Sequence, residues 1–186
     1  MATITVIGSV NLDIVASASK LPAPGETVTG ATLGRFPGGK GANQALAAQR
    51  LGADVSLVAC VGDDATADEA LALLRKGGVN LDAIQVLEGT ATGTALIAVA
   101  PDGENQIVVA PGANALLTPE RVQAPVADAV ICQLEVPADT IAAVAADYEG
   151  FFCVNLAPAR QIDVSILQRA DLVVVNETES AWYGGT

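Results

Sequence analysis

Histidine is absent from the 186 residues of this chain, and aromatic residues make up only 3% of it. The first absence excludes Ser-His and Cys-His nucleophile pairs and every metal site that relies on histidine ligands. The second means that Ala, Val, Leu and Ile must form most of the core. With a hydrophobic content of 51%, the chain is long and apolar enough for one substantial domain.

Basic residues are also scarce. Nine Lys and Arg residues face 21 Asp and Glu residues, which gives a formal net charge of −12. Nucleic acids and anionic membrane surfaces both require a basic footprint, so we expect neither as a partner. An anionic substrate would need a local exception built from Lys40, Arg160 or backbone N–H groups. No apolar run is long enough to span a bilayer, and the chain opens with a strand-like run instead of a signal peptide.

The three cysteines, Cys60, Cys132 and Cys153, are far apart in the sequence, and each lies inside an apolar run. Buried, reduced thiols are the expected state of such residues, and a metal site is a much weaker alternative. Because free thiols persist in reducing compartments, we predict a cytoplasmic protein.

The stretch from Gly38 to Ala45, which reads GGKGANQA, is the most informative part of the sequence. Glycines let a backbone approach a ligand closely. The Ala-rich helix predicted to follow directs its free N–H groups and the positive end of its dipole at the loop. Lys40 adds a cation, and Asn43 adds an amide that both donates and accepts hydrogen bonds. This combination suits a polyhydroxylated or anionic small molecule; the alternative is a glycine loop that only tightens a turn.

The same stretch is not a P-loop. The spacing from Gly34 to Lys40 approaches that motif, but Gly41 stands where a P-loop needs Ser or Thr to bind Mg²⁺. The preceding residues, 32–37, also make a poor buried strand. We therefore reject a P-loop nucleoside triphosphatase.

Strand-length apolar runs alternate with helical patterns along the chain. This alternation predicts an α/β fold with a mostly parallel sheet covered by helices on both faces. Expected strands are 3–10, 55–61, 129–134, 151–155 and 172–175. Expected helices are 42–51, 67–76, 119–127, 138–146 and 164–168, with Gly52 and Gly77-Gly78 as C-terminal signals and Thr118-Pro119 as an N-terminal one.

Two segments break this rhythm and predict a small antiparallel β-layer. Residues 27–36 read as one strand, and 94–110 read as a hairpin around Asp102-Gly103, a strong turn signal. Such a layer could form a lid that excludes water, or it could be an ordinary extension of the sheet edge.

Polar side chains follow the predicted parallel strands where each one ends. Asn11 and Asp13, Gln133 and Glu135, Asn155, and Asn176 with Glu179 occupy these positions. In open α/β sheets, ligands bind beyond the carboxyl ends of the strands, where such groups can bind hydroxyls. Asn and Asp are also common in turns and caps, so any one of these positions has an equally good structural explanation.

These residues carry a resemblance to a known family. The chain resembles the ribokinase-like (PfkB) carbohydrate kinases over nearly its whole length. The matching segments, in the family's order, are 8–13 (GSVNLD), 24–30 (PGETVTG), 38–45 (GGKGANQA), 112–114 (GAN), 134–137 (LEVP), 155–159 (NLAPA) and 176–179 (NETE). The resemblance implies a ribokinase-like fold in which 1–186 is the N-terminal portion of a single domain, with lid segments at about 14–36 and 94–110.

The resemblance implies an ATP-dependent phosphotransferase that phosphorylates D-ribose at its 5-hydroxyl. It assigns the sugar-binding role to Asn11, Asp13, Gly39, Lys40, Asn43 and Glu135. It places Asn176 and Glu179 near the ATP phosphates and Mg²⁺, with no direct metal ligand in this chain. K⁺ is a further candidate cofactor, and a homodimer through the β lid is the implied assembly.

One part of the family's pattern is missing. The family's catalytic general base is an Asp in an Asp-Thr-x-(Gly/Ala)-Ala-Gly-Asp run, which also provides an anion hole, and this run would lie beyond Thr186. We therefore expect a kinase when the protein is complete and an inactive fragment from 1–186 alone. The alternatives are a deoxyribokinase or another pentose or nucleoside kinase, and a truncated, non-catalytic module for sugar binding or dimerisation.

Overall fold

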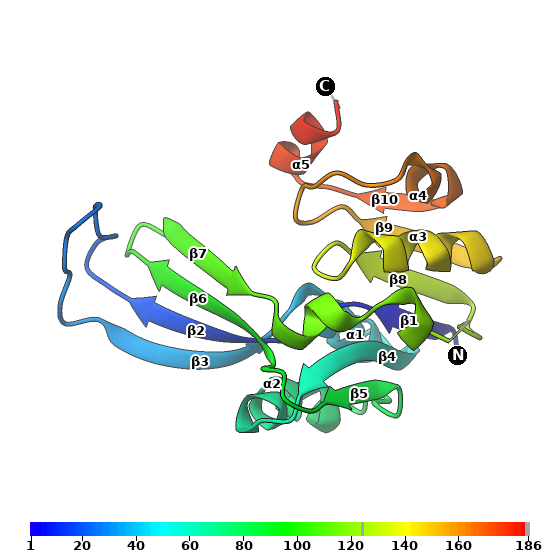
Figure 1. Ribbon diagram of the computed structural model, residues 1–186, viewed down its shortest axis with the longest axis horizontal. Coiled ribbons are helices and arrows are strands. Elements are labelled where there is room, and N and C mark those ends of the chain that lie inside the picture. The colour runs from blue at the N-terminus through cyan, green and yellow to red at the C-terminus, as the bar shows by residue number, and fades with distance from the viewer. Residues whose placement is uncertain (124, 185–186) are drawn as a thin grey trace.

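The main body of the molecule is built around a parallel β-sheet, as Figure 1 shows. The computed structural model describes residues 1–123 and 125–184. Its main sheet has six strands in the order β10-β9-β8-β1-β4-β5, and every neighbouring pair is parallel. The strands are β1 (Thr3–Ile7), β4 (Asp54–Gly62), β5 (Ile84–Leu87), β8 (Ala129–Gln133), β9 (Phe151–Asn155) and β10 (Leu172–Val174).

Helices cover both faces of this sheet, as the alternation of strands and helices predicts. Helices α1 (Lys40–Arg50) and α2 (Ala65–Gly77) pack on one face, and α3 (Ala138–Asp147) and α4 (Val164–Arg169) pack on the other. The short α5 (Glu177–Trp182) follows β10. The expected glycine signals at the ends of α1 and α2 are present, since Gly52 has a φ of 94° and Gly78 a φ of 79°. Asp64 caps α2 by accepting a hydrogen bond from the Ala67 N–H.

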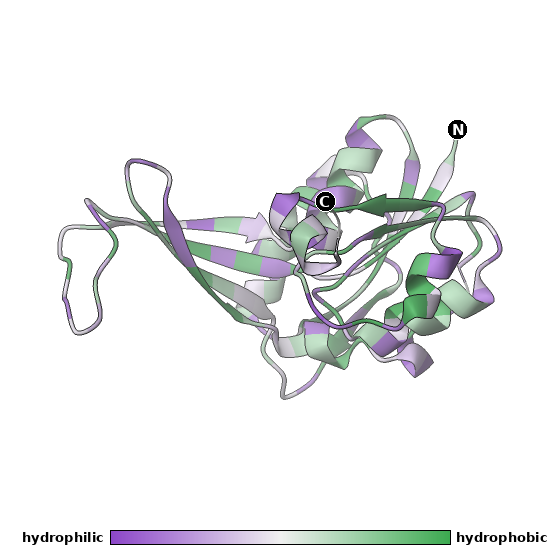
Figure 2. Cartoon of the chain, turned by 90° about the horizontal axis from the view of Figure 1, so that it is seen from above, coloured by the Kyte–Doolittle hydropathy of each residue, from purple (hydrophilic) through white to green (hydrophobic). Residues whose placement is uncertain are grey.

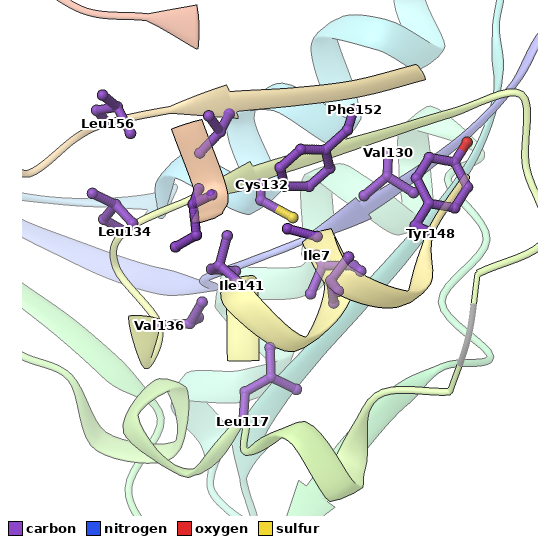
Figure 3. Close-up of a cluster of buried hydrophobic side chains, with 14 of the residues drawn as sticks. Ile7, Leu117, Val130, Cys132, Leu134, Val136, Ile141, Tyr148, Phe152 and Leu156 are labelled. Carbon is purple, nitrogen blue, oxygen red and sulfur yellow. The ribbon is translucent and has the colours of Figure 1, made fainter. Parts of the chain in front are cut away.

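Alternate side chains of each strand divide the core into two clusters. Val6 and Leu57 pack under α1 and α2, while Ile7, Cys132 and Val154 pack under α3 and α4. Figure 3 shows the second cluster, in which aliphatic side chains pack with two aromatic residues, Tyr148 and Phe152. The cysteines Cys60, Cys132 and Cys153 are buried free thiols, as the sequence predicts, and burial raises the pKa of each one.

A second, four-stranded sheet projects away from this body (Figure 1). Its order is β3-β2-β6-β7, with β2 (Asn11–Ser17), β3 (Thr32–Gly38), β6 (Gly93–Val99) and β7 (Asn105–Ala110). The β2–β3 and β6–β7 pairs are antiparallel, and the hairpin turn falls at Gly103, whose φ is 89°. The central β2–β6 pair is parallel, because both strands leave the body in the same direction.

This second sheet, which we call the lid sheet, exposes apolar side chains on both faces. Asp13, Phe36, Ala95 and Val109 share one face through their register, and Ile14, Leu96 and Val108 share the other. Phe36 is 54% exposed and Val108 is 67% exposed. Figure 2 shows hydrophobic and hydrophilic residues interspersed along these strands. Exposed apolar side chains on both sides of a sheet favour a covering group on each side.

Three expectations about single elements were wrong. The helix predicted at 119–127 is only a 3₁₀ turn, η2 (Pro119–Arg121), because Pro125 cannot continue a helix; residue 124 lies outside the described residues. The first strand ends at Ile7 instead of residue 10, and the chain enters the lid sheet at Asn11. The strand expected at 27–36 begins at Thr32. The sequence reading also missed β5, α5 and the 3₁₀ helix η1 (Gly112–Leu116).

None of the helices in the described part of the chain combines the length and the apolar character that crossing a membrane requires.

Candidate functional site

Two crossings between the body and the lid sheet meet at one place. The segment from Gly8 to Val10 leads from β1 into β2, and β3 returns to the body at Gly38, directly before α1. The two segments are in close contact, since the Ala42 N–H donates to the Ser9 carbonyl over 2.9 Å. Gly39 has a φ of 92°, and a Cβ there would stand 2.8 Å from the Asn11 nitrogen. Only glycine fits this turn.

Glu135 is held against the start of α1. Its Oε2 accepts a hydrogen bond of 2.5 Å from the Ser9 hydroxyl and one of 2.9 Å from the Lys40 N–H. The Ser9 oxygen in turn accepts from the Gly41 N–H over 3.3 Å. A carboxylate is well placed at a helix N-terminus, where free N–H groups and the helix dipole favour negative charge. The first free N–H of this helix therefore binds a side chain of the protein itself, which the sequence reading did not foresee.

Asp13 is the second carboxylate of this region. It shares a face of β2 with Asn11, two residues earlier. Its carboxylate lies over Gly38, where a Cβ would stand 2.3 Å from Oδ2. Partial burial raises the pKa of Asp13 above its usual value, and the negative charge of Glu135 raises it further. Asp13 over Gly38 and Glu135 on the Lys40 N–H thus flank the same turn, one from the lid sheet and one from the body.

Asn11 completes this group from a buried position at the start of β2, where it is 3% exposed. Its Oδ1 accepts a hydrogen bond of 2.7 Å from the Nδ2 of Asn114. The structure thus brings together four of the six residues expected to bind the sugar, namely Asn11, Asp13, Gly39 and Glu135, together with the backbone of Lys40. These groups can bind neighbouring hydroxyls of a polyol.

The remaining expected sugar contacts are side chains on the first turn of α1. The Lys40 side chain is partly buried, and Asn43 is exposed. Within 1–123 and 125–184, neither side chain forms a hydrogen bond or ion pair. Arg160, the other candidate cation, donates to the carbonyls of Leu134 and Val136 instead.

Asn176 and Glu179 have a local structural role in the described structure. Asn176 Oδ1 accepts from the Glu179 N–H over 2.8 Å, and Glu179 Oε2 accepts from the Asn176 N–H over 2.9 Å. This reciprocal pair is a capping box that starts α5. The pair lies beyond the carboxyl end of β10, at the edge where the other strand-end residues also lie.

Two more strand-end amides are buried without a complete set of partners. Gln133 and Asn155 are in register on β8 and β9. Gln133 Oε1 and Asn155 Oδ1 are buried and accept no hydrogen bond from the described residues. The other end of the Gln133 amide donates to Gln44 Oε1 over 2.5 Å. The carboxyl edge of the sheet is therefore polar, as the sequence predicts.

Sequence reasoning missed the roles of Ser9, Gly38 and Asn114. All three occur in segments that carry the family resemblance, but Ser and Asn are too common in turns to indicate a contact by themselves. Their roles depend on residues far away in the chain, such as Glu135 for Ser9, and only the fold brings them together.

The fold defines a class of protein: a parallel α/β domain with a separate lid sheet, and polar side chains where the two meet. The chain belongs to the pfkB family of carbohydrate kinases, whose family model matches residues 1–185.

Similar proteins include a ribokinase of Bacillus subtilis, 39% identical over 97% of this chain and 64% of the relative. A deoxyribokinase of Salmonella typhi is 35% identical over 95% of this chain and 60% of the relative. Among solved structures, a ribokinase from Thermotoga maritima matches all of this chain and 64% of its own with a TM-score of 0.89 and 32% identity. The Arabidopsis thaliana ribokinase complexed with ribose and ATP has a TM-score of 0.84 and 29% identity, over 97% of this chain and 62% of its own. The chain thus spans between 60 and 64% of the length of these proteins.

Proposed function

We propose that the complete protein carrying this chain is an ATP-dependent kinase that phosphorylates D-ribose at its 5-hydroxyl. The observation that carries the proposal is the convergence of Asn11, Asp13 and Glu135 on the glycine turn before α1. Support comes from the family of the chain and from the ribokinases among its relatives, one of them solved in complex with ribose and ATP.

Each residue of the group has a chemical part in this proposal. The ionised Asp13 accepts hydrogen bonds from sugar hydroxyls, and Asn11 donates one. Glu135 contributes its Oε1, because the Ser9 hydroxyl and the Lys40 N–H both donate to its Oε2. Gly39 lets the sugar approach the backbone, while Lys40 and Asn43 reach it from the first turn of α1. A missing hydroxyl would leave one of these groups unpaired, which is how such a site discriminates between sugars.

ATP and Mg²⁺ complete the proposed reaction, with K⁺ as a candidate activator. Within 1–123 and 125–184 there is no group of three Cys, Asp or Glu side chains arranged to hold a metal ion. We therefore limit the part of this chain in nucleotide binding to Asn176 and Glu179. Glu179 Oε2 is bonded in the helix cap, and its Oε1 is the oxygen that would bind a water of hydrated Mg²⁺. When bound, ATP supplies the phosphoryl group. We place the general base outside residues 1–186, so that this segment alone binds sugar without turnover.

Two alternatives remain open to the same test. The deoxyribokinase relative favours 2-deoxyribose as a second candidate substrate. A non-catalytic module for sugar binding or dimerisation is the candidate from another class. The test is ADP release by the complete protein with ATP, Mg²⁺ and either D-ribose or 2-deoxy-D-ribose. Faster release with D-ribose supports the proposal, and faster release with the deoxy sugar favours the deoxyribokinase. No release with any pentose or hexose rejects both kinase assignments and leaves the non-catalytic module.

We also propose that the protein is a cytoplasmic homodimer joined through the lid sheet. The lid face that carries Ile14, Leu96 and Val108 turns away from Asp13 and exposes apolar side chains. A second copy covering this face would remove them from water. Three buried free thiols suit the reducing conditions of the cytoplasm.

A further inference from the structure

The side chain of Asn114 forms three hydrogen bonds at the base of the lid sheet. It lies in η1, which follows β7 back into the body, and it is 1% exposed. Its Oδ1 accepts from the Val10 N–H over 2.9 Å. Its Nδ2 donates to the Val10 carbonyl over 3.1 Å and to Asn11 Oδ1 over 2.7 Å.

These bonds fix which way the Asn11 amide faces. An Asn side chain carries an acceptor at one end and a donor at the other, and a half-turn exchanges the two. Because Asn114 donates to Oδ1, the Nδ2 group of Asn11 must point elsewhere. In the described part of the chain, that Nδ2 has no hydrogen-bond partner, and it is not among the unpartnered atoms that are shielded from solvent. Asn11 therefore presents a donor to the site.

The packing around the two amides leaves little room for another arrangement. A Cβ at Gly93 would stand 2.1 Å from Asn114 Nδ2 and 2.3 Å from Asn11 Oδ1. Gly93 is the first residue of β6, in register with Asn11 on β2. The amide pair thus fills the space that a glycine leaves between two strands that enter the lid sheet.

We propose that Asn114 is a positioning residue for sugar binding: it holds Asn11 as a hydrogen-bond donor beside Asp13, which is an acceptor. Asn11 and Asp13 share one face of β2, so the pair offers one donor and one acceptor to neighbouring hydroxyls. Such a pair recognises a vicinal diol: one hydroxyl of the diol accepts a hydrogen bond from Asn11, and the other donates one to Asp13. The inference rests on the proposed function, since it names the specificity of that same site.

A purely structural role in holding the base of the lid sheet is the competing explanation. A thermodynamic cycle separates the two. D-ribose affinity is measured by calorimetry on the complete protein for wild type, Asn114→Ala, Asn11→Ala and the double variant. If Asn114 acts through Asn11, Asn114→Ala weakens binding about tenfold in the wild-type background, the loss expected for one hydrogen bond. In the Asn11→Ala background it changes affinity by less than about twofold.

Thr92 provides the matched control. It is also buried at the base of the lid sheet, where it donates to Asp64 Oδ1 over 2.7 Å and accepts from the Gly62 N–H over 2.9 Å. It has no hydrogen bond with Asn11 in the described structure. Thr92→Val loosens the same region, and its effect on ribose affinity is expected to be equal in both Asn11 backgrounds.

Asn114→Asp is the second variant, for use if the alanine variant does not fold. Its carboxylate still accepts from the Val10 N–H but cannot donate to Asn11, so the Asn11 amide turns and presents its oxygen to the sugar. The expected result is again a loss of about tenfold that disappears in the Asn11→Ala background. Equal losses from the Asn114 variants in both backgrounds overturn the inference. If wild type binds no ribose, the proposed function fails and the inference falls with it, so the two failures are distinguishable.

Discussion

The carboxylate of Asp13 occupies the space where a side chain at Gly38 would begin. A Cβ built on Gly38 would stand 2.3 Å from Asp13 Oδ2 and 2.5 Å from its Cγ. The glycine in the loop before α1 thus has a use besides the turn: it makes room for an acidic side chain from the neighbouring strand. The site and the glycine run are parts of one packing arrangement.

Gly38→Ala is expected to weaken sugar binding with little loss of stability. The added methyl group meets the end of the Asp13 side chain, which can rotate away but then loses its position in the site. Gly41→Ala is the matched variant, because its Cβ would stand 2.6 Å from the Ser9 nitrogen and 2.7 Å from the Gly8 carbonyl carbon. These are backbone atoms, so we expect a cost of about 1–3 kcal/mol in the free energy of unfolding.

Urea unfolding and ribose calorimetry on both variants test this pair. Gly38→Ala should lose ribose affinity while keeping its unfolding midpoint, and Gly41→Ala should lower the midpoint. A Gly38→Ala variant with unchanged ribose affinity would contradict the placement of Asp13.

Asp13→Asn is expected to change how stability depends on pH. Because the folded-state pKa of Asp13 is raised above its usual 3.8, the folded protein binds more protons than the unfolded chain between these two values. The contribution of Asp13 to the free energy of unfolding therefore falls as pH rises through that window. Asn carries no charge, so the variant should gain stability relative to wild type as pH rises, and the gain should be constant above the folded pKa.

Asp163→Asn supplies a control of opposite sign. Hydrogen bonds from Ser165 lower the pKa of Asp163, so its removal should cost stability relative to wild type as pH rises. Chemical unfolding at a series of pH values measures both differences. A flat difference for Asp13→Asn would mean that its folded and unfolded pKa values are equal.

Glu135→Gln is expected to move the acid limb of sugar affinity. If the ionised form of Asp13 binds the sugar, affinity falls as pH decreases through its folded pKa. Removing the charge of Glu135 removes the second cause of the raised pKa, so the midpoint moves to lower pH. Burial, the larger cause, remains, so the midpoint stays above 3.8. Ribose titrations from neutral to acidic pH would check this, and an unmoved midpoint would show that the two carboxylates do not interact.

A charged residue on the outer face of the lid sheet is expected to dissociate the proposed dimer. Leu96 is 52% exposed and lies on the face away from Asp13. Leu96→Lys would place a charge in the interface, where desolvation is costly. Leu51→Lys is the control, since Leu51 is 88% exposed at the end of α1, outside the lid sheet. Sedimentation should give monomers for Leu96→Lys alone; monomeric wild type would reject the dimer.

The body of the fold was predictable from the sequence because its elements carry local signals. Period, length and terminal glycines place α1, α2 and the strands β4, β8 and β9 to within a few residues. The failures occurred where tertiary structure decides. β5 is a half-exposed strand of four residues without a clear pattern, and the continuous run from Thr3 to Asp13 concealed the change from one sheet to another at Gly8 to Val10.

The candidate site was predictable in composition but not in its contacts. The sequence indicates which polar residues gather at the carboxyl edge, because strand ends in a parallel sheet meet there. It does not show that Ser9 and the Lys40 N–H share one oxygen of Glu135, or that Asn114 determines the orientation of Asn11. Such contacts join residues about a hundred positions apart, and no local pattern encodes them. Asn176 and Glu179 differ from these residues, because their contact is a helix cap between positions only three residues apart, which is a local motif.

The most direct test of the account is the affinity of the complete protein for D-ribose, measured by calorimetry for wild type and for Asp13→Asn at neutral pH. The substitution preserves the shape of the side chain and removes the charged acceptor, which is worth about 1.5–3 kcal/mol in a hydrogen bond. We expect one ribose site per chain in wild type and a loss of about tenfold to a hundredfold in affinity in the variant. Equal affinities would show that the sugar does not bind at the pair of Asn11 and Asp13.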